Sequence, residues 1–465
     1  MKKPASDFSR RRFLGRCCAA VGTTGILSTL AQLRVIGAVA GNNLDRTRAA
    51  ALPPDYKALV CLFLNGGNDA TNLVIPSDAT SYAAYAKSRA ELAITQPNLL
   101  AITPRRYADG RTWGLHPSVP ALRDLFVQGK LAVLANVGTL VRPTTLADYN
   151  SGKNLPPQLF SHSDQQLQWQ SGVPDKPFET GWGGRLGDLL SALNSSNDIS
   201  MCISIGSGQS FQRGNTVSNY IVGSFGVPPM DFGPGSPNHG TRTTALRNIL
   251  ASSPPNLLEA AFGSLSYDAL NDSDTLRAAL QFAPTLKTSF PGNDLAGQLA
   301  MVAKLISVAP ALGLKRQIFF VELGGWDLHA AQLTGHGPLL ADLSAAMKAF
   351  YDATVEMGVA NQVTTFTASD FGRTYIPNAG GTDHGWGNHQ LIMGGAVQGG
   401  DFYGTMPSLA VGANDDTGRG RWIPSTSVDE YSATLATWFG VSASNLSVVL
   451  PNIGRFAKPN LGFMG

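Results

Sequence analysis

The feature that most constrains the fold is a repeated pattern of short apolar runs, each ended by a polar or glycine-rich turn. Residues 57–64 form the clearest run, and similar runs cover residues 130–136, 199–205, 316–323 and 362–367. Continuous apolar runs are typical of strands that are buried on both faces of a parallel sheet. The sequence therefore predicts a central sheet of mostly parallel strands.

Segments with helical periodicity separate these runs, at residues 120–129, 185–193, 295–308 and 338–358. Because strand and helix alternate along the whole chain, we expect a doubly wound α/β fold in which helices flank a mostly parallel central sheet. Residues 206–254 are rich in Gly, Ser, Pro and Asn and lack clear periodicity, so we expect an insertion or cap there.

The first forty residues have the three parts of an export signal. They contain a basic start that leads into residues 9–14 (SRRRFL), then a weakly apolar stretch, then the small-residue pattern of residues 38–40 (AVA). This arrangement closely resembles a twin-arginine signal, which the twin-arginine export machinery reads. We therefore expect residues 1–40 to be cleaved, leaving one domain over residues 41–465, without a membrane span, in the periplasm or secreted.

Cleavage would change the charge balance of the chain. The full sequence has a net charge of +3, but residues 1–40 hold seven of its 35 basic residues and one acid, so 28 basic and 31 acidic residues follow. No basic stripe with interleaved aromatic residues occurs, and we expect no nucleic-acid partner. Cys61 and Cys202 are the two cysteines beyond the signal, and whether they pair is open.

Candidate metal ligands follow the predicted strands. Ligands of open α/β sheets bind beyond the carboxyl ends of the strands, where glycine-rich loops allow close approach. Mixed histidine and aspartate ligation suits Zn²⁺ or Mn²⁺, whereas an all-oxygen site would suit Ca²⁺ or Mg²⁺. We expect His336 and His389 to be merely exposed or hydrogen-bonded. The candidate ligands are Asp69, Asp327, His329, Asp370 and His384.

A candidate nucleophile, Ser161, precedes the helical segment 165–169. A serine at a helix N-terminus gains from the helix dipole, which also attracts an anionic ester, but serine there is also a common N-cap. The chain has no Gly-x-Ser-x-Gly elbow, which argues against an α/β-hydrolase. It also has no phosphate-binding loop of the Gly-x-x-x-x-Gly-Lys type and no dinucleotide fingerprint.

Taken together, these motifs resemble the domain-of-unknown-function 1501 family of exported bacterial proteins. That family is similar to the alkaline phosphatase and sulfatase superfamily, whose members hydrolyse or transfer phosphate or sulfate esters on a mixed sheet with metals at the strand ends. The matching motifs are 64–72 (LNGGNDATN), Ser161-His162 with Trp169 and Gly172, 324–329 (GGWDLH), 369–374 (SDFGRT), 380–385 (GGTDHG), and the Gly-Gly pairs 394–395 and 399–400.

The resemblance implies a role for each candidate. Ser161 stands where the superfamily has its nucleophile, His162 would orient the ester or assist proton transfer, and Arg373 would bind an ester oxygen. One metal would be held by Asp327, His329 and His384, and a second by Asp370 with Asp69 or Asn65.

Two departures from the superfamily pattern leave alternatives open. Phe371 follows Asp370 where the superfamily often has a histidine, and the residue nearest to its acid after the first strand is Asn65. We therefore expect one or two divalent metals in a hydrolase of phosphate or sulfate esters, with a small-molecule or glycan ester as substrate. The alternative is a non-catalytic relative that binds an envelope component, a glycan or a partner protein.

Overall fold

A computed structural model describes residues 52–195, 199–227, 235–252 and 254–465. Its centre is a nine-stranded sheet in the order β11-β5-β10-β9-β1-β8-β6-β7, with β12 also paired to β5. Every pairing in this sheet is parallel except those of β10, which runs antiparallel to both β5 and β9. The prediction of a mostly parallel central sheet in an α/β fold is thus confirmed.

Five strands of this sheet lie in the predicted runs, because those runs are apolar on both faces. The remaining strands are short or, like β10, begin with polar residues. The strands of the main sheet are β1 (Lys57–Leu64), β5 (Leu131–Gly138), β6 (Cys202–Ile205), β7 (Tyr220–Val222), β8 (Arg316–Leu323), β9 (Val363–Ser369), β10 (Asn388–Gly394), β11 (Phe402–Gly404) and β12 (Thr426–Ser427).

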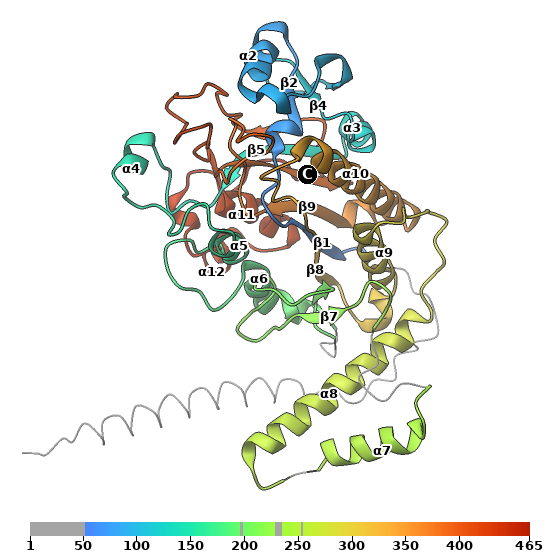
Figure 1. The fold of residues 1–465 in the computed structure, drawn as a ribbon. Coiled ribbons are helices and arrows are strands. Elements are labelled where there is room, and N and C mark those ends of the chain that lie inside the picture. The colour runs from blue at the N-terminus through green and yellow to red at the C-terminus, as the bar shows by residue number, and fades with distance from the viewer. Residues whose placement is uncertain (1–51, 196–198, 228–234, 253) are drawn as a thin grey trace, which may run out of the picture.

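Helices cover both faces of the sheet (Figure 1). Alternate residues of β1 point to opposite sides: Val60 and Leu62 pack with α9, α10 and α3, whereas Leu59 and Phe63 pack with α6, α11 and α12. The helices are α2 (Ala79–Arg89), α3 (Pro120–Val127), α4 (Leu146–Asn150), α5 (His162–Ser171), α6 (Trp182–Leu190), α7 (His239–Leu250), α8 (Leu257–Leu280), α9 (Asp294–Ser307), α10 (Gln332–Glu356), α11 (Val428–Phe439) and α12 (Leu446–Val449).

A second, three-stranded sheet joins β2 (Val74–Pro76), β4 (Trp113–Leu115) and β3 (Leu100–Ile102). Together with α2 it lies above the main sheet in Figure 1. None of the helices among the described residues is long and apolar enough to span a membrane. Cys61 and Cys202 are buried, free thiols.

The predicted helix over residues 338–358 begins six residues earlier, at Gln332, and contains Pro338. Gln332 and His336 are buried and hydrogen-bonded, so tertiary contacts hold the added turns despite the proline. Within the predicted insertion, β7 joins the main sheet and α7 forms a helix that leads to α8. The predicted signal segment, residues 1–40, lies outside the described residues.

Candidate metal centre

Three strand ends meet at one edge of the sheet and position the candidate residues. In the register of the sheet, Leu64 at the end of β1 pairs with Leu323 of β8 and with Ser369 of β9. The loops that carry Asp69, Asp327 and Asp370 therefore start side by side. Because β10 runs antiparallel, the loop before it, which carries His384, returns to the same edge.

Two glycines allow these loops to touch backbone to backbone. A Cβ at Gly66, where φ is +119°, would lie 2.5 Å from the backbone nitrogen of Asp327. A Cβ at Gly381 would lie 2.2 Å from the carbonyl carbon of His329. Any larger residue would push the loops apart, so both glycines are needed for the site to form.

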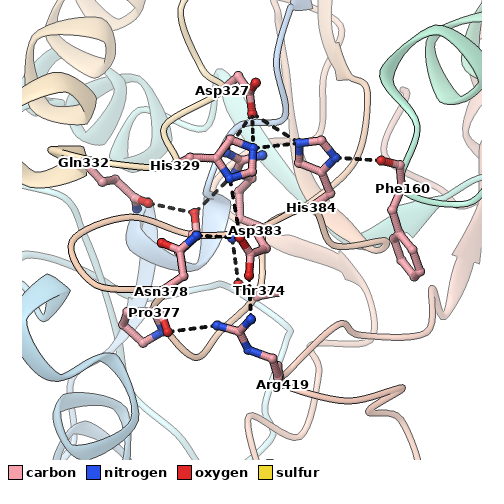
Figure 2. Close-up of polar contacts among 12 residues, drawn as sticks. Phe160, Asp327, His329, Gln332, Thr374, Pro377, Asn378, Asp383, His384 and Arg419 are labelled. Carbon is pink, nitrogen blue, oxygen red and sulfur yellow. Dashed lines mark hydrogen bonds and ion pairs between the residues drawn. The ribbon is translucent and has the colours of Figure 1, made fainter.

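Asp327 is the centre of a cluster with three histidines. Its Oδ1 lies 3.0 Å from Nε2 of His329 and 3.3 Å from Nε2 of His384, and these two nitrogens are 2.9 Å apart (Figure 2). Its Oδ2 lies 3.3 Å from Nε2 of His162. The side chains of Asp327 and His329 are exposed, so a ligand can reach the cluster from solvent.

Each of the three imidazole rings has an acceptor at its other nitrogen. Nδ1 of His162 lies 2.6 Å from Oδ2 of Asp370, and Nδ1 of His384 lies 2.6 Å from the carbonyl oxygen of Phe160. Nδ1 of His329 lies 3.4 Å from a carboxylate oxygen of Asp383. A ring that donates from Nδ1 presents the lone pair of Nε2. In its neutral form each of the three rings therefore presents an Nε2 lone pair toward Asp327.

This donor set fits a divalent metal. Neutral Nε2 atoms and a carboxylate are typical ligands of Zn²⁺, and ligands at about 2.0–2.1 Å in a tetrahedral site lie roughly 3.3 Å from one another. His162, Asp327 and His384 offer ligand atoms within 4.8 Å of one another, and His329 adds a fourth Nε2. Two imidazole lone pairs 2.9 Å apart repel unless a cation or a proton lies between them.

The charges of the cluster favour its metal-binding forms. Partial burial alone would raise the pKa of Asp327, but Arg373 and the nearby histidines bring that pKa below its ordinary value. Partial burial lowers the pKa of His384, and the charge of Arg373 lowers it further. Asp327 is thus ionised and His384 neutral near pH 7.

Arg373 is buried directly behind Asp327. Its Nη2 donates to Oδ1 of Asp327 at 3.0 Å and its Nε donates to Thr382 at 3.3 Å. Its Nη1 has no hydrogen-bond partner among the described residues, and only 3% of the residue is exposed. A buried guanidinium with a free N–H can bind an anionic oxygen.

Ser161 lies next to the cluster at the N-terminus of α5. Its neighbours on both sides contact the cluster, Phe160 through its carbonyl group on His384 and His162 through its ring on Asp327. The Ser161 hydroxyl donates to Oδ2 of Asp164 at 2.6 Å and makes no bond that caps the helix. The serine therefore has a carboxylate beside it that can accept its proton.

Asp370 contacts the cluster through His162. It is fully buried, and its Oδ1 accepts the N–H of Gly66 at 3.1 Å, while its Oδ2 accepts from His162 and from Gln166. The carboxylate expected to bind a second metal thus has three donors, and it holds the ring of His162.

Asp69 lies apart from the cluster of Asp327. It is buried in an ion pair with Arg89 and accepts hydrogen bonds from Thr71 and Gln332. Burial alone would raise the pKa of Asp69, but Arg89 brings it below its ordinary value. Asn65, the other candidate from this loop, donates to Glu322 at 2.8 Å. The structure brings neither residue to Asp370 by a direct hydrogen bond or ion pair.

His336 and His389, expected to be exposed or hydrogen-bonded, are both buried. His336 lies within hydrogen-bonding distance of Asn68, and Nδ1 of His389 accepts the N–H of Asn136. The expectation of exposure was therefore wrong for both, because β10 and α10 carry them into the interior.

Sequence reasoning assigned no role to two residues that support the cluster, Asp383 and Asp164. Asp383 immediately precedes His384 and Asp164 lies three residues after Ser161, so each lay within a recognised motif. The only sequence signal was the presence of an acidic residue in each motif. The partners of these acids, His329 for Asp383 and Ser161 for Asp164, could not be identified without the loop geometry.

A cavity of about 300 Å³ lies at the same edge of the sheet. Asn65 and Gly324, which belong to the loops of the site, line this cavity. The residues of the Asp327 cluster do not line it. Its other lining residues are Ile205, Gly206, Ser224, Asp294, Gln298 and Glu322.

Comparison with known proteins gives a match to a family model over part of the chain and a set of remote structural similarities. The chain is similar to the PsFucS1 sulfatase from Pseudoalteromonas sp. (10% identity, 90% of this chain and 72% of that chain, TM-score 0.34). It is also similar to a protein in the alkaline phosphatase superfamily from Vibrio parahaemolyticus (12% identity, 91% of this chain and 77% of that chain, TM-score 0.36). A third similar structure is alkaline phosphatase from the Antarctic bacterium TAB5 (11% identity, 73% of this chain and 92% of that chain, TM-score 0.29). A variant of the last is described with Mg bound.

These likenesses concern the fold alone. Comparison with curated proteins finds no match. Residues 291–437, which include Asp327, His329, Asp370 and His384, match the model of a family described as protein of unknown function (DUF1501), which confirms the resemblance predicted from the motifs.

Proposed function

We propose that the protein is an exported, metal-dependent hydrolase of phosphate or sulfate esters. The observation that carries the proposal is the convergence of three Nε2 atoms on the carboxylate of Asp327, beside a buried arginine with a free N–H. Metal ligands, an anion-binding group and a serine at a helix N-terminus together suit ester hydrolysis better than structural metal binding, because a structural site needs neither of the last two.

The metal would be held by Asp327, His329 and His384, with His162 as a further ligand. Nitrogen and carboxylate donors favour Zn²⁺ or Mn²⁺ over Ca²⁺ or Mg²⁺. When bound, such an ion acts as a Lewis acid that polarises an ester oxygen and lowers the pKa of a coordinated hydroxyl group. One metal is favoured over two, because Asp69 and Asp370 are engaged elsewhere and Phe371 supplies no ligand.

Residues of the chain would have the following roles in the reaction. The oxygen of Ser161 attacks the phosphorus or sulfur atom while Asp164 accepts the hydroxyl proton. The bond from phosphorus or sulfur to the ester oxygen breaks, and the leaving oxygen takes a proton from solvent water, so that the alcohol departs neutral. Water then hydrolyses the seryl ester and releases phosphate or sulfate. Arg373 and the N-terminus of α5 stabilise the negative charge that develops on the transferred group.

The alcohol part of the ester would occupy the neighbouring cavity. Asp294 and Glu322 line that cavity, and their negative charges disfavour an anion there. Carboxylates and amides instead accept hydrogen bonds from hydroxyl groups. This lining supports a hydroxylated small-molecule or glycan ester as substrate.

A non-catalytic relative that binds an envelope component, a glycan or a partner protein is the second candidate. The observation that favours it is the ring of Phe371, which stacks on His384 with centroids 4.5 Å apart and lies 4.8 Å from the ring of His162. A phenyl ring against two of the four ligands reduces the room for an ester.

Export is a separate part of the proposal. It is supported by the twin-arginine pattern in residues 1–40, which would direct the protein to the periplasm or the medium through the twin-arginine machinery. Replacing Arg10 and Arg11 by Lys should leave the protein in the cytoplasm with its signal uncleaved.

The experiment that tests the activity combines elemental analysis of the purified protein with turnover of aryl phosphate and aryl sulfate. We expect about one equivalent of Zn or Mn, lost in Asp327→Ala together with turnover. Bound metal without turnover in the unaltered protein would favour the non-catalytic candidate. Absence of divalent metal, with turnover unaffected by added Zn²⁺ or Mn²⁺, would reject both the metal and the mechanism.

A further inference from the structure

A row of three buried polar side chains connects Arg373 to the interior of the protein. The row consists of Asp69, Gln332 and Thr382, and we call it the Asp69 row. These three residues and Arg373 are each at most 3% exposed. They come from four different segments: the loop after β1, the start of α10, the loop before β10 and the loop after β9. Because they are buried, their polar atoms depend on one another for hydrogen bonds.

The carboxylate of Asp69 fixes the orientation of Gln332. Arg89 is fully buried and pairs with Oδ2 of Asp69, which keeps the carboxylate ionised. An ionised carboxylate only accepts hydrogen bonds, so the amide group of Gln332 donates to Oδ2 through its nitrogen, Nε2. The side-chain oxygen of Gln332, Oε1, is therefore left to accept a hydrogen bond from another group.

Thr382 extends the same direction of hydrogen bonding to Arg373. Its hydroxyl group donates to Oε1 of Gln332 at 2.7 Å, because that oxygen cannot donate. The single proton of the hydroxyl group is used in this bond, so its oxygen only accepts on the other side. There Nε of Arg373 donates to it at 3.3 Å. Every donor in the row thus points toward Asp69, whose charge sets the direction.

Two hydrogen bonds determine how the planar guanidinium group of Arg373 lies. Thr382 accepts from Nε, and Asp327 accepts from Nη2 at 3.0 Å. A planar group held at two of its nitrogens cannot turn about either bond, so the third nitrogen, Nη1, keeps a fixed direction. This nitrogen is the one without a hydrogen-bond partner among the described residues. Without the bond to Thr382, the group could pivot on Asp327.

We propose that the residues of the Asp69 row are positioning residues for the anion-binding group of Arg373. The proposal rests on the proposed function, in which Arg373 binds the phosphate or sulfate group that is transferred. A donor that is fixed in advance binds an anion more tightly than one that must be ordered on binding. Asp69, which was expected to bind a metal, thus serves the site without contacting a metal.

Thr382→Val tests the proposal, because valine has nearly the shape of threonine but lacks the hydroxyl group. We expect the dissociation constant of inorganic phosphate to rise about tenfold, since Nε of a buried guanidinium loses its acceptor. Calorimetric titration of the zinc-saturated protein measures this constant. Thr382→Ser keeps the hydroxyl group and should bind phosphate like the original protein. Thr365→Val is the control, because it removes a buried hydroxyl of β9 that has no partner among the described residues.

A double-mutant cycle shows whether Thr382 acts through Arg373. In the Arg373→Met background, which lacks the guanidinium group, Thr382→Val should weaken phosphate binding no further. Gln332→Met removes the acceptor that fixes the hydroxyl proton of Thr382, and it should weaken phosphate binding by at least about threefold. All constants are compared at zinc saturation, so that changes in metal affinity do not enter.

Three results would overturn the proposal. They are an unchanged phosphate constant in Thr382→Val or Gln332→Met, equal weakening in Thr382→Ser and Thr382→Val, and a further tenfold weakening by Thr382→Val in the Arg373→Met background. Failure of the proposed function has a different signature. In that case the zinc-saturated original protein binds neither phosphate nor sulfate, and the positioning role is rejected with it.

Discussion

The ring of His329 lies between two carboxylates, with its Nδ1 3.4 Å from Oδ1 of Asp383 and its Nε2 3.0 Å from Oδ1 of Asp327. Burial alone would raise the pKa of Asp383, but Asn378 and Arg419 bring it below its ordinary value, so Asp383 is ionised. An ionised acceptor at Nδ1 fixes the ring and makes Nε2 a stronger ligand. Figure 2 shows this chain of contacts from Arg419 through Asp383 to His329.

Asp383→Asn should weaken metal binding about 10- to 100-fold, because the amide no longer supplies a negative charge at Nδ1 of His329. Calorimetric titration of the chelator-treated protein with Zn²⁺ would measure the change. Arg419→Ala is the control: it removes the partner of Asp383 but keeps the carboxylate, and its effect should be smaller. Equal Zn²⁺ affinity for Asp383→Asn and the original protein would show that His329 is not a ligand.

Ser161→Ala should lower kcat for an aryl ester by at least about 10³-fold, since the proposed nucleophile is lost. Ser163 provides a matched control, because its hydroxyl lies 3.3 Å from that of Ser161 and also contacts Asp164. Ser163→Ala should retain near-normal kcat, and both variants should bind metal normally. A similar small loss in both variants would contradict a nucleophilic role for Ser161.

Arg373→Met should weaken inhibition by inorganic phosphate about 10- to 100-fold, the effect of losing a hydrogen bond from a charged donor. The inhibition constant of Arg373→Lys should lie between those of the original protein and Arg373→Met. Lys keeps the positive charge but cannot contact both Asp327 and a bound anion. The inhibition constant is measured at constant metal occupancy, since Arg373 also contacts Asp327. An unchanged constant in Arg373→Met would place the anion elsewhere.

The strands that form the edge of the site could be predicted because each is a run of consecutive, mostly apolar residues. The run 57–64 became β1 with the same bounds, and 316–323 became β8. In contrast, β10 carries Asn388, His389 and Gln390, and each of these side chains makes a hydrogen bond to a distant chain segment. Such partners leave no local signal, so neither the antiparallel strand nor the burial of His389 could be predicted.

The part of the candidate site that could be predicted is the part in which the order of the strands alone brings the residues close together. Asp327, His329 and His384 come together because their loops share one edge of the sheet. Asp69 starts from the same edge, yet its loop turns inward and Arg89, from α2, pairs with it. Residue spacing does not show that Arg89, twenty residues after Asp69, pairs with it. The sequence alone therefore could not distinguish a buried ion pair at Asp69 from a metal ligand.

The buried, neutral state of His389 should make the protein less stable in weak acid. Burial lowers the pKa of His389 to about 4, against about 6.5 for an exposed histidine, and its Nδ1 accepts the N–H of Asn136 at 3.1 Å. Between these two values the unfolded chain binds a proton and the folded chain does not. The contribution of His389 is therefore present above pH 6.5 and is lost as the pH falls toward 4, by about 3 kcal/mol.

Urea unfolding at several pH values between 7 and 4.5 would measure this loss. In His389→Gln, whose amide oxygen can accept from Asn136 but does not titrate in this range, the free energy of unfolding should fall less steeply with decreasing pH. His239→Gln, on α7, is the control and should keep the original slope. If the slope is the same in all three proteins, His389 does not contribute to the pH dependence, and the other buried histidines, His116 and His336, whose pKa values are also lowered to about 4 by burial, would have to account for it.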